Sequence, residues 1–216
     1  MTKLDAYAPP AASAKPLSPT ELLASLREAL TPWKCGTPFY IFAYGSLMWN
    51  PGFTFDARHV ATIRGYHRSF RVWSRINRGT PERPGLVLTL ECGGSCRGLV
   101  YRIPADLVQE QMNLIWKREM NYGSYRPKWL NCSVGDETFR ALAFTVNRQC
   151  SGYAGQIPME AVVETIASAS GRYGPAYEYL FSTIDSLREH GIRDSRVEQL
   201  ANLVRSRLAA AKGPTP

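Results

Sequence analysis

The pattern of apolar and polar positions divides the chain into one early helix, a long region of strands and several later helices. Ser18, Pro19 and Glu21 form a capping box with proline at the first helical position. The apolar stripe that follows ends at Leu30, before Pro32. Runs rich in β-branched and aromatic residues, separated by glycine and proline, predict strands at Tyr40–Tyr44, Val60–Ile63, His67–Trp73, Leu86–Leu90, Gly98–Ile103, Lys128–Cys132 and Thr138–Val146.

Helical spacing of apolar residues predicts four more helices. They run from about Ala105 to Met120, from Pro158 to Gly171, through Tyr177–Leu187 up to Gly191, and over Ser195–Ala211. No internal repeat is visible. The Arg75–Gly85 connection is longer than a hairpin needs, which is typical of a functional loop.

The strand at Tyr40–Tyr44 ends abruptly at Gly45 and Ser46. Backbone N–H groups beyond the end of a strand have no ladder partner, so a bound anion or carbonyl oxygen can accept hydrogen bonds from them. A plainer interpretation is that Gly45 only allows a tight turn into the loop at Trp49–Gly52. The turn is therefore a candidate binding site, and a purely structural role stays open.

One carboxylate stands where the helical pattern predicts an apolar residue. Val108, Met112 and Ile115 form one apolar stripe, and the next position on it is Glu119. That position is near the helix C-terminus, where the macrodipole disfavours negative charge. Either the helix frays, or a neighbour such as Arg118 pairs with the carboxylate, or Glu119 is a partly desolvated general acid and base with a raised pKa.

Length and composition limit the class of protein. The 216 residues suffice for one well-buried core, and 44% hydrophobic with 20% charged residues is typical of a soluble protein. No apolar run is long enough to cross a bilayer and the N-terminus has no signal pattern, so we expect a cytoplasmic protein without a membrane partner. The sequence predicts a disordered tail over residues 1–17 and a single domain over residues 18–216.

The cysteines and histidines predict no metal site, and the spacing of the arginines argues against a nucleic acid partner. The five cysteines are scattered, and the three histidines give no zinc-site spacing, so we interpret Cys92–Cys96 as a glycine-rich hairpin loop. A net charge of +8 suits nucleic acid, an anionic membrane or a small acidic ligand. The arginines between Arg64 and Arg83 lack the interleaved exposed aromatic residues of a single-strand binder, and an anionic substrate suits them equally well.

Several motifs, in order along the chain, resemble the ChaC-like branch of the γ-glutamylcyclotransferase superfamily. The opening motif is Phe42–Leu47 followed by Trp49–Phe53. The later blocks are Arg78–Gly85, Arg97–Tyr101, Arg118–Met120, Gly174–Leu180 and Gly191–Asp194. The resemblance covers most of the chain, from about Phe39 to Leu203, and its ordered set of motifs is far more specific than a lone Tyr-Gly-Ser.

This resemblance implies an α+β fold with a small, partly closed mixed β-barrel and peripheral helices. It also implies cleavage of glutathione to 5-oxoproline and cysteinylglycine, without a metal or organic cofactor. The family's catalytic glutamate corresponds to Glu119. Its substrate-binding turn corresponds to Ile41, Phe42, Ala43, Tyr44, Gly45 and Ser46, with Leu47 beside it, and Tyr153 is the candidate for a tyrosine that closes the pocket.

Other functions stay open at this point. The same chemistry could act on γ-glutamyl-amino acids or γ-glutamylamines. The stretch Val72–Asn77 differs from the family's usual motif, so the resemblance does not predict the second half of the substrate. A nucleic-acid-binding module would use the arginines between Arg64 and Arg83. A non-catalytic relative is a third alternative, and the presence of Glu119 argues against it. The sequence does not predict the oligomeric state.

Overall fold

The computed structural model describes residues 15–211, which divide into two compact units. The barrel unit comprises residues 15–69 and 89–150, and the helical unit comprises residues 70–88 and 151–211. Two long strands, β2 (Ala57–Ser74) and β3 (Gly85–Ile103), have residues in both units. The predicted tail lies outside the described residues up to residue 14, and the single domain over residues 18–216 stays a prediction.

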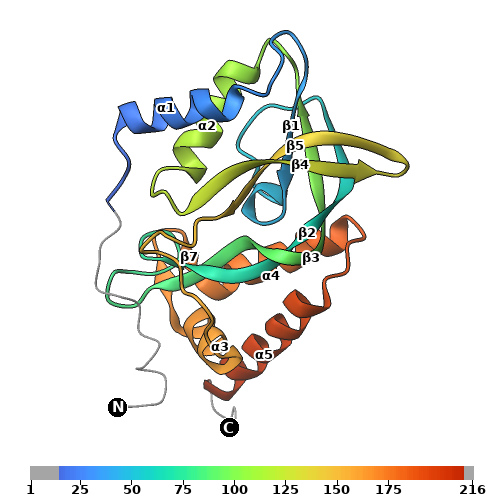
Figure 1. Ribbon diagram of the computed structural model, residues 1–216. Helices are drawn as coiled ribbons and strands as arrows, with labels where there is room; N and C mark the ends of the chain where they lie inside the picture. The colour runs from blue at the N-terminus through green and yellow to red at the C-terminus, as the bar shows by residue number, and fades with distance from the viewer. Residues whose placement is uncertain (1–14, 212–216) are drawn as a thin grey trace. The chain divides into compact units, whose positions relative to one another are not determined.

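The strands form a closed barrel in the order β1-β3-β2-β4-β5, with β5 also pairing with β3. The other members are β1 (Phe39–Ala43), β4 (Tyr125–Val134) and β5 (Glu137–Val146). β1 pairs antiparallel with β3 and parallel with β5, and β4 and β5 form an antiparallel hairpin (Figure 1). A mixed barrel in a chain that also contains helices confirms the expected α+β class.

The strand β1 is deeply buried in the barrel unit. Ile41, Phe42 and Ala43 are fully buried, which explains the uninterrupted apolar run in the sequence. Gly98 on β3 makes this close approach possible, because a Cβ atom there would lie 2.3 Å from the Ala43 carbonyl oxygen and 2.8 Å from the Phe42 ring. The end of β1 is therefore held tightly against β3.

Two helices of the barrel unit pack side by side, α1 (Pro19–Leu30) and α2 (Val108–Glu119) (Figure 1). The predicted capping box is confirmed: the Ser18 hydroxyl accepts from the Glu21 N–H at 3.3 Å, and the Glu21 carboxylate accepts from the Ser18 N–H at 2.8 Å. The Trp116 indole N–H donates to the Ser25 hydroxyl at 2.8 Å and links the two helices. No described helix is long and apolar enough to span a membrane.

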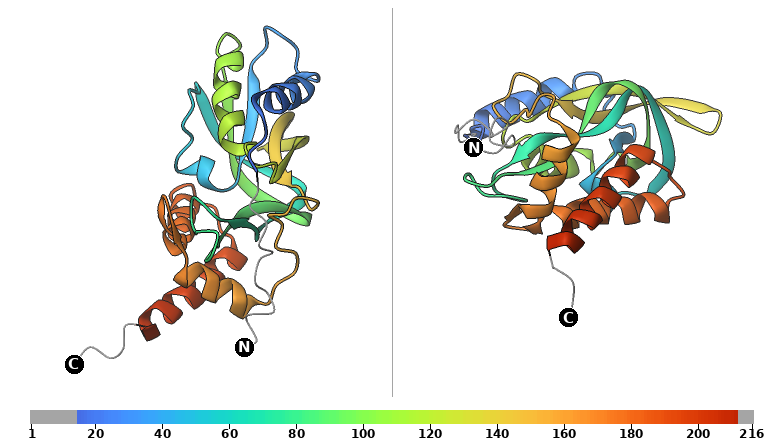
Figure 2. Two further views of the ribbon diagram at one scale, coloured as in Figure 1. Left: turned by 90° about the vertical axis from the view of Figure 1, so that its left-hand side faces the viewer. Right: turned by 90° about the horizontal axis from the view of Figure 1, so that it is seen from below.

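The helical unit contains α3 (Met159–Ser168), α4 (Ala176–Glu189) and α5 (Ser195–Ala211), which pack against one another (Figure 2). A short two-stranded ladder, β6 (Ser170–Gly171) with β7 (Gly174–Pro175), connects α3 to α4. The predicted end of α3 at Gly171 is therefore three residues too late, because Ala169 is already extended.

The structure corrects two other predictions. Residues Cys92–Cys96 do not form a hairpin loop, because β3 continues through them as one strand. Gly93 and Gly94 have φ of +100° and +75°, which allows a local distortion within a strand instead of a chain reversal. Gly65, with φ of +83°, likewise joins the two strands predicted at Val60–Ile63 and His67–Trp73 into β2.

Candidate active site

The turn that follows β1 has all of its carbonyl groups occupied. It continues into a short 3₁₀ helix, Ser46–Met48. The Gly45 carbonyl accepts from the Met48 N–H at 2.9 Å, and the Ser46 carbonyl accepts from the N–H groups of Trp49 and Asn50. The side chains of β2 and β3 bind the other carbonyls of the turn.

Arg68 on β2 is a buried arginine that holds the start of the turn. Its Nε–H donates to the Tyr44 carbonyl at 2.6 Å, and its Nη2 donates to the Arg97 carbonyl. The Tyr101 hydroxyl on β3 donates to the Leu47 carbonyl at 3.0 Å. These contacts fix the orientation of the peptide planes in the turn.

Three consecutive N–H groups of this turn point away from those contacts. In a trans peptide the N–H is opposite to the C=O, so fixing the Tyr44 carbonyl toward Arg68 directs the Gly45 N–H the other way. Within residues 15–211 the N–H groups of Gly45, Ser46 and Leu47 have no acceptor. Such a row of donors can bind a carboxylate or an oxyanion.

Glu119 is the last residue of α2, so the helix has not frayed at this position. Its side chain is 14% exposed, and its Oε1 lies 3.1 Å from the Nε of Arg118. Burial raises the pKa of the Glu119 carboxyl above its ordinary value, and the Arg118 guanidinium opposes that change less strongly. Both the ion pair and the desolvation expected from the sequence are therefore present.

The guanidinium of Arg118 also contacts the turn. Its Nη2 donates to the Ser46 hydroxyl at 3.0 Å, and its Nη1 donates to the carbonyls of Asn50 at 2.6 Å and Pro51 at 3.0 Å. Gly52, in the same loop, has φ of +68°. A Cβ atom at this position would lie 3.3 Å from Nη1 of Arg118, so the loop packs closely against the guanidinium. One guanidinium thus joins the Glu119 carboxylate to the turn that carries the unpaired donors.

A second contact holds α2 against the same loop. The Gln111 side-chain oxygen, two turns before Glu119, accepts from the Thr54 N–H at 2.9 Å. The helix is therefore attached to the loop near its start by Gln111 and near its end by Arg118. This fixes the position of the carboxylate relative to the turn.

The sequence-predicted site residues fall into three groups. Tyr44, Gly45, Ser46 and Leu47 lie in the turn that Arg118 connects to Glu119, all within the barrel unit. The Ile41, Phe42 and Ala43 side chains are in the barrel core and position the turn. Tyr153 belongs to the helical unit, where it forms an antiparallel bridge with Val72, and its role stays a prediction.

Sequence reasoning missed Arg68, Tyr101 and the second role of Arg118. A signal for Arg68 was present in the sequence. Arg68 lies on the same face of the strand as Phe70 and Val72, which are both apolar and buried. A charged residue on the apolar face of a strand needs buried partners, and carbonyl groups of a turn can supply them.

The barrel unit also has two open hollows of about 490 Å³ each, and neither is lined by Glu119 or by the turn. Tyr40 and Arg102 line one of them, and Arg64 and Arg140 line the other. Among the described residues, no three or more His, Cys, Asp or Glu side chains are grouped so that they could hold a metal ion.

Comparisons with known proteins agree with the motif pattern. The family model described as ChaC-like protein matches residues 39–207. The chain is similar to a glutathione-specific γ-glutamylcyclotransferase of Escherichia coli, with 36% identity over 80% of this chain and 75% of that protein. It is also similar to glutathione-specific γ-glutamylcyclotransferase 1 of Rattus norvegicus, with 31% identity over 91% of this chain and 92% of that protein.

A crystal structure of a glutathione-specific γ-glutamylcyclotransferase from yeast has the same fold. The TM-score is 0.73 at 21% identity, over 79% of this chain and 96% of that one. The structural likeness supports the barrel architecture, and the family match rests on the sequence. The resemblance first seen in the motifs is thus confirmed, and the chain belongs to the ChaC-like protein family.

Proposed function

We propose that the protein is a γ-glutamylcyclotransferase that degrades glutathione to 5-oxoproline and cysteinylglycine. The observation that carries the proposal is the Arg118 guanidinium, which contacts both the Glu119 carboxylate and the Ser46 hydroxyl. It joins a proton acceptor to a row of unpaired N–H donors. The names of the relatives from Escherichia coli and Rattus norvegicus support glutathione as the substrate.

In the proposed reaction, Glu119 takes a proton from the α-ammonium group of the γ-glutamyl substrate. The free amine attacks the γ-carbonyl carbon of the same molecule and forms the C–N bond of the five-membered ring. Glu119 then returns the proton to the departing nitrogen as the old amide bond breaks. The attacking nitrogen loses its second proton on becoming the ring N–H, and the departing amine takes up this proton and leaves as an ammonium group. The raised pKa of the Glu119 carboxyl suits both proton transfers, because a stronger base is needed to accept the ammonium proton.

Substrate folding is the second task of the site. The nucleophile and the electrophile belong to one molecule, so the protein gains rate by holding it in a cyclic near-attack conformation. The N–H groups of Gly45, Ser46 and Leu47 would bind the α-carboxylate or the developing oxyanion. Ile41, Phe42 and Ala43 would support this turn from the core.

The direct test incubates purified protein with glutathione and detects 5-oxoproline, with a metal chelator present. Release of 5-oxoproline and cysteinylglycine in equal amounts supports the proposal. A parallel assay with γ-glutamyl-alanine separates it from the related activity on γ-glutamyl-amino acids. If neither substrate releases 5-oxoproline, the proposed function is wrong.

The cytoplasmic location and the absence of a nucleic acid partner stay predictions. A non-specific nucleic acid binder loses affinity steeply as salt rises. A gel-shift experiment at low salt with single-stranded and double-stranded oligonucleotides therefore tests the second prediction, and retarded complexes would contradict it.

A further inference from the structure

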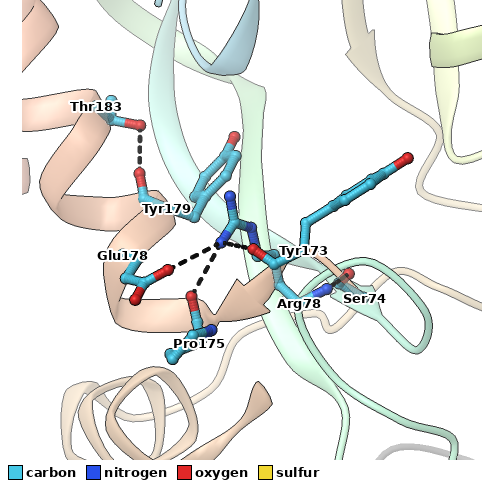
Figure 3. Close-up of polar contacts among 7 residues, drawn as sticks. All are labelled: Ser74, Arg78, Tyr173, Pro175, Glu178, Tyr179 and Thr183. Carbon is cyan, nitrogen blue, oxygen red and sulfur yellow. Dashed lines mark hydrogen bonds and ion pairs between the residues drawn. The ribbon is translucent and has the colours of Figure 1, made fainter. Parts of the chain in front are cut away.

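The helical unit contains a buried arginine that the proposed reaction does not use. Arg78 belongs to the Arg78–Gly85 motif, and its side chain is only 10% exposed. Its Nη1 donates to the carbonyls of Tyr173 at 2.6 Å and Pro175 at 3.2 Å, and lies 3.9 Å from the Glu178 carboxylate (Figure 3). All three contacts are made by this single nitrogen.

The guanidinium carbon lies 5.8 Å from the centre of the Tyr179 ring, and its other edge has no hydrogen-bond partner in the part of the chain that the structure describes. Within residues 15–211, neither Nε nor Nη2 of Arg78 donates a hydrogen bond. Neither atom is among the fully enclosed side-chain atoms without a partner, so both keep contact with solvent. Figure 3 shows the second terminal nitrogen pointing away from the three acceptors. Together, Nε–H and Nη2–H form the parallel pair of donors that matches the two oxygens of a carboxylate.

The charge of Arg78 is incompletely compensated. Burial lowers the pKa of the guanidinium, and Glu178 and Tyr179 oppose that change only in part. Glu178 is beyond hydrogen-bond distance and its side chain is 54% exposed, so water screens it. A bound anion at the free edge would supply the missing countercharge.

The surroundings hold this edge in place. A Cβ atom at Gly79 would lie 2.1 Å from the Gly85 backbone nitrogen, and one at Gly171 would lie 2.4 Å from the Gly79 nitrogen. The loop that carries Arg78 is therefore packed backbone to backbone against its own end and against β6. Such a rigid donor pair binds with little loss of side-chain entropy.

We propose that the Nε–Nη2 edge of Arg78 binds a carboxylate of a small-molecule ligand. A carboxylate matches the planar edge and carries a single charge, whereas a doubly charged phosphate would be repelled more strongly by Glu178. The ligand is a small carboxylic acid bound within the helical unit, so the inference does not rest on the proposed function.

The substitution Arg78→Lys tests the proposal. Lysine keeps a charge that can reach the carbonyls of Tyr173 and Pro175, but it loses the paired donors. Arg83→Lys, in the same loop and exposed, is the matched control.

The measurement is thermal unfolding, which does not depend on turnover. Millimolar succinate should raise the Tm of the parent protein and of Arg83→Lys but not that of Arg78→Lys. If succinate changes the Tm of Arg78→Lys as much as that of the parent protein, or raises neither, Arg78 is a purely structural residue and the proposal is wrong.

Discussion

Replacing Glu119 by glutamine separates catalysis from stability more sharply than any other substitution in this chain. Glutamine keeps the shape of the side chain but cannot accept or return a proton. General acid–base catalysis contributes about 10²–10⁴-fold to a rate. We therefore expect kcat for glutathione to fall by at least about a hundredfold, which corresponds to about 2.7 kcal/mol or more in the activation barrier.

The same substitution should leave the fold as stable as before, or more stable. The pKa of the Glu119 carboxyl is raised in the folded protein, because burial disfavours its charged form. A carboxyl whose pKa is raised on folding stabilises the folded state at pH values below its pKa in the unfolded chain, about 4.3. This stabilisation is lost as the pH rises through the pKa of the carboxyl in the folded protein. Glutamine does not titrate, so Glu119→Gln has no such loss. The difference in free energy of unfolding between the variant and the parent protein should therefore grow from near zero at pH 4 toward neutral pH.

The assay pairs 5-oxoproline release with urea unfolding at pH 4 and pH 7. The matched control is Glu189→Gln, because Glu189 is also the last residue of a helix, α4, but is exposed. The control should change the free energy of unfolding by no more than about 0.5 kcal/mol at either pH and leave turnover intact. A folded Glu119→Gln protein with normal turnover would refute the assignment of Glu119 as the acid and base.

Three further predictions concern the parts that hold the site. Gly45→Val should raise KM for glutathione by about tenfold or more in steady-state kinetics, because a branched side chain would stand beside the N–H donors; unchanged KM and kcat would contradict this. Arg68→Met should lower the free energy of unfolding by about 1–3 kcal/mol in urea, because it removes the guanidinium that donates to the carbonyls of Tyr44 and Arg97; a change below about 0.5 kcal/mol would mean that water replaces the guanidinium. Ser18→Ala should cost about 1 kcal/mol of unfolding free energy through the lost capping box, while Ser18→Thr should keep most of it.

The elements of the fold were predictable where a local pattern determines them. The capping box at Ser18 and the apolar run of β1 depend on residues close together in sequence, and both are present in the structure. The glycine pair Gly93–Gly94 was misinterpreted as a hairpin loop, because a positive φ suits both a turn and a distorted strand. Only the strands that pair with β3 decide between the two, and the sequence does not show them.

The candidate site was predictable in part for the same reason. Glu119 was noticeable because it interrupts an apolar stripe, which is a local signal. The contacts that orient it are not local: Arg118 reaches back 72 residues to Ser46, and Arg68 reaches 24 residues to Tyr44. The sequence marks Arg68 as a charged residue on an apolar strand face, but a hydrogen bond to a backbone carbonyl does not depend on the side chain of the accepting residue, so the sequence does not identify Tyr44 as its partner.

Arg118 explains how one carboxylate can be both buried and functional. Burial and the negative end of α2 both favour the protonated form of Glu119. The Arg118 guanidinium favours the charged form instead. The same guanidinium also binds the Ser46 hydroxyl and the Asn50 carbonyl, so its position beside Glu119 is fixed by the turn and by the loop that follows it. The residue that adjusts the basicity of Glu119 is therefore the same one that fixes its position.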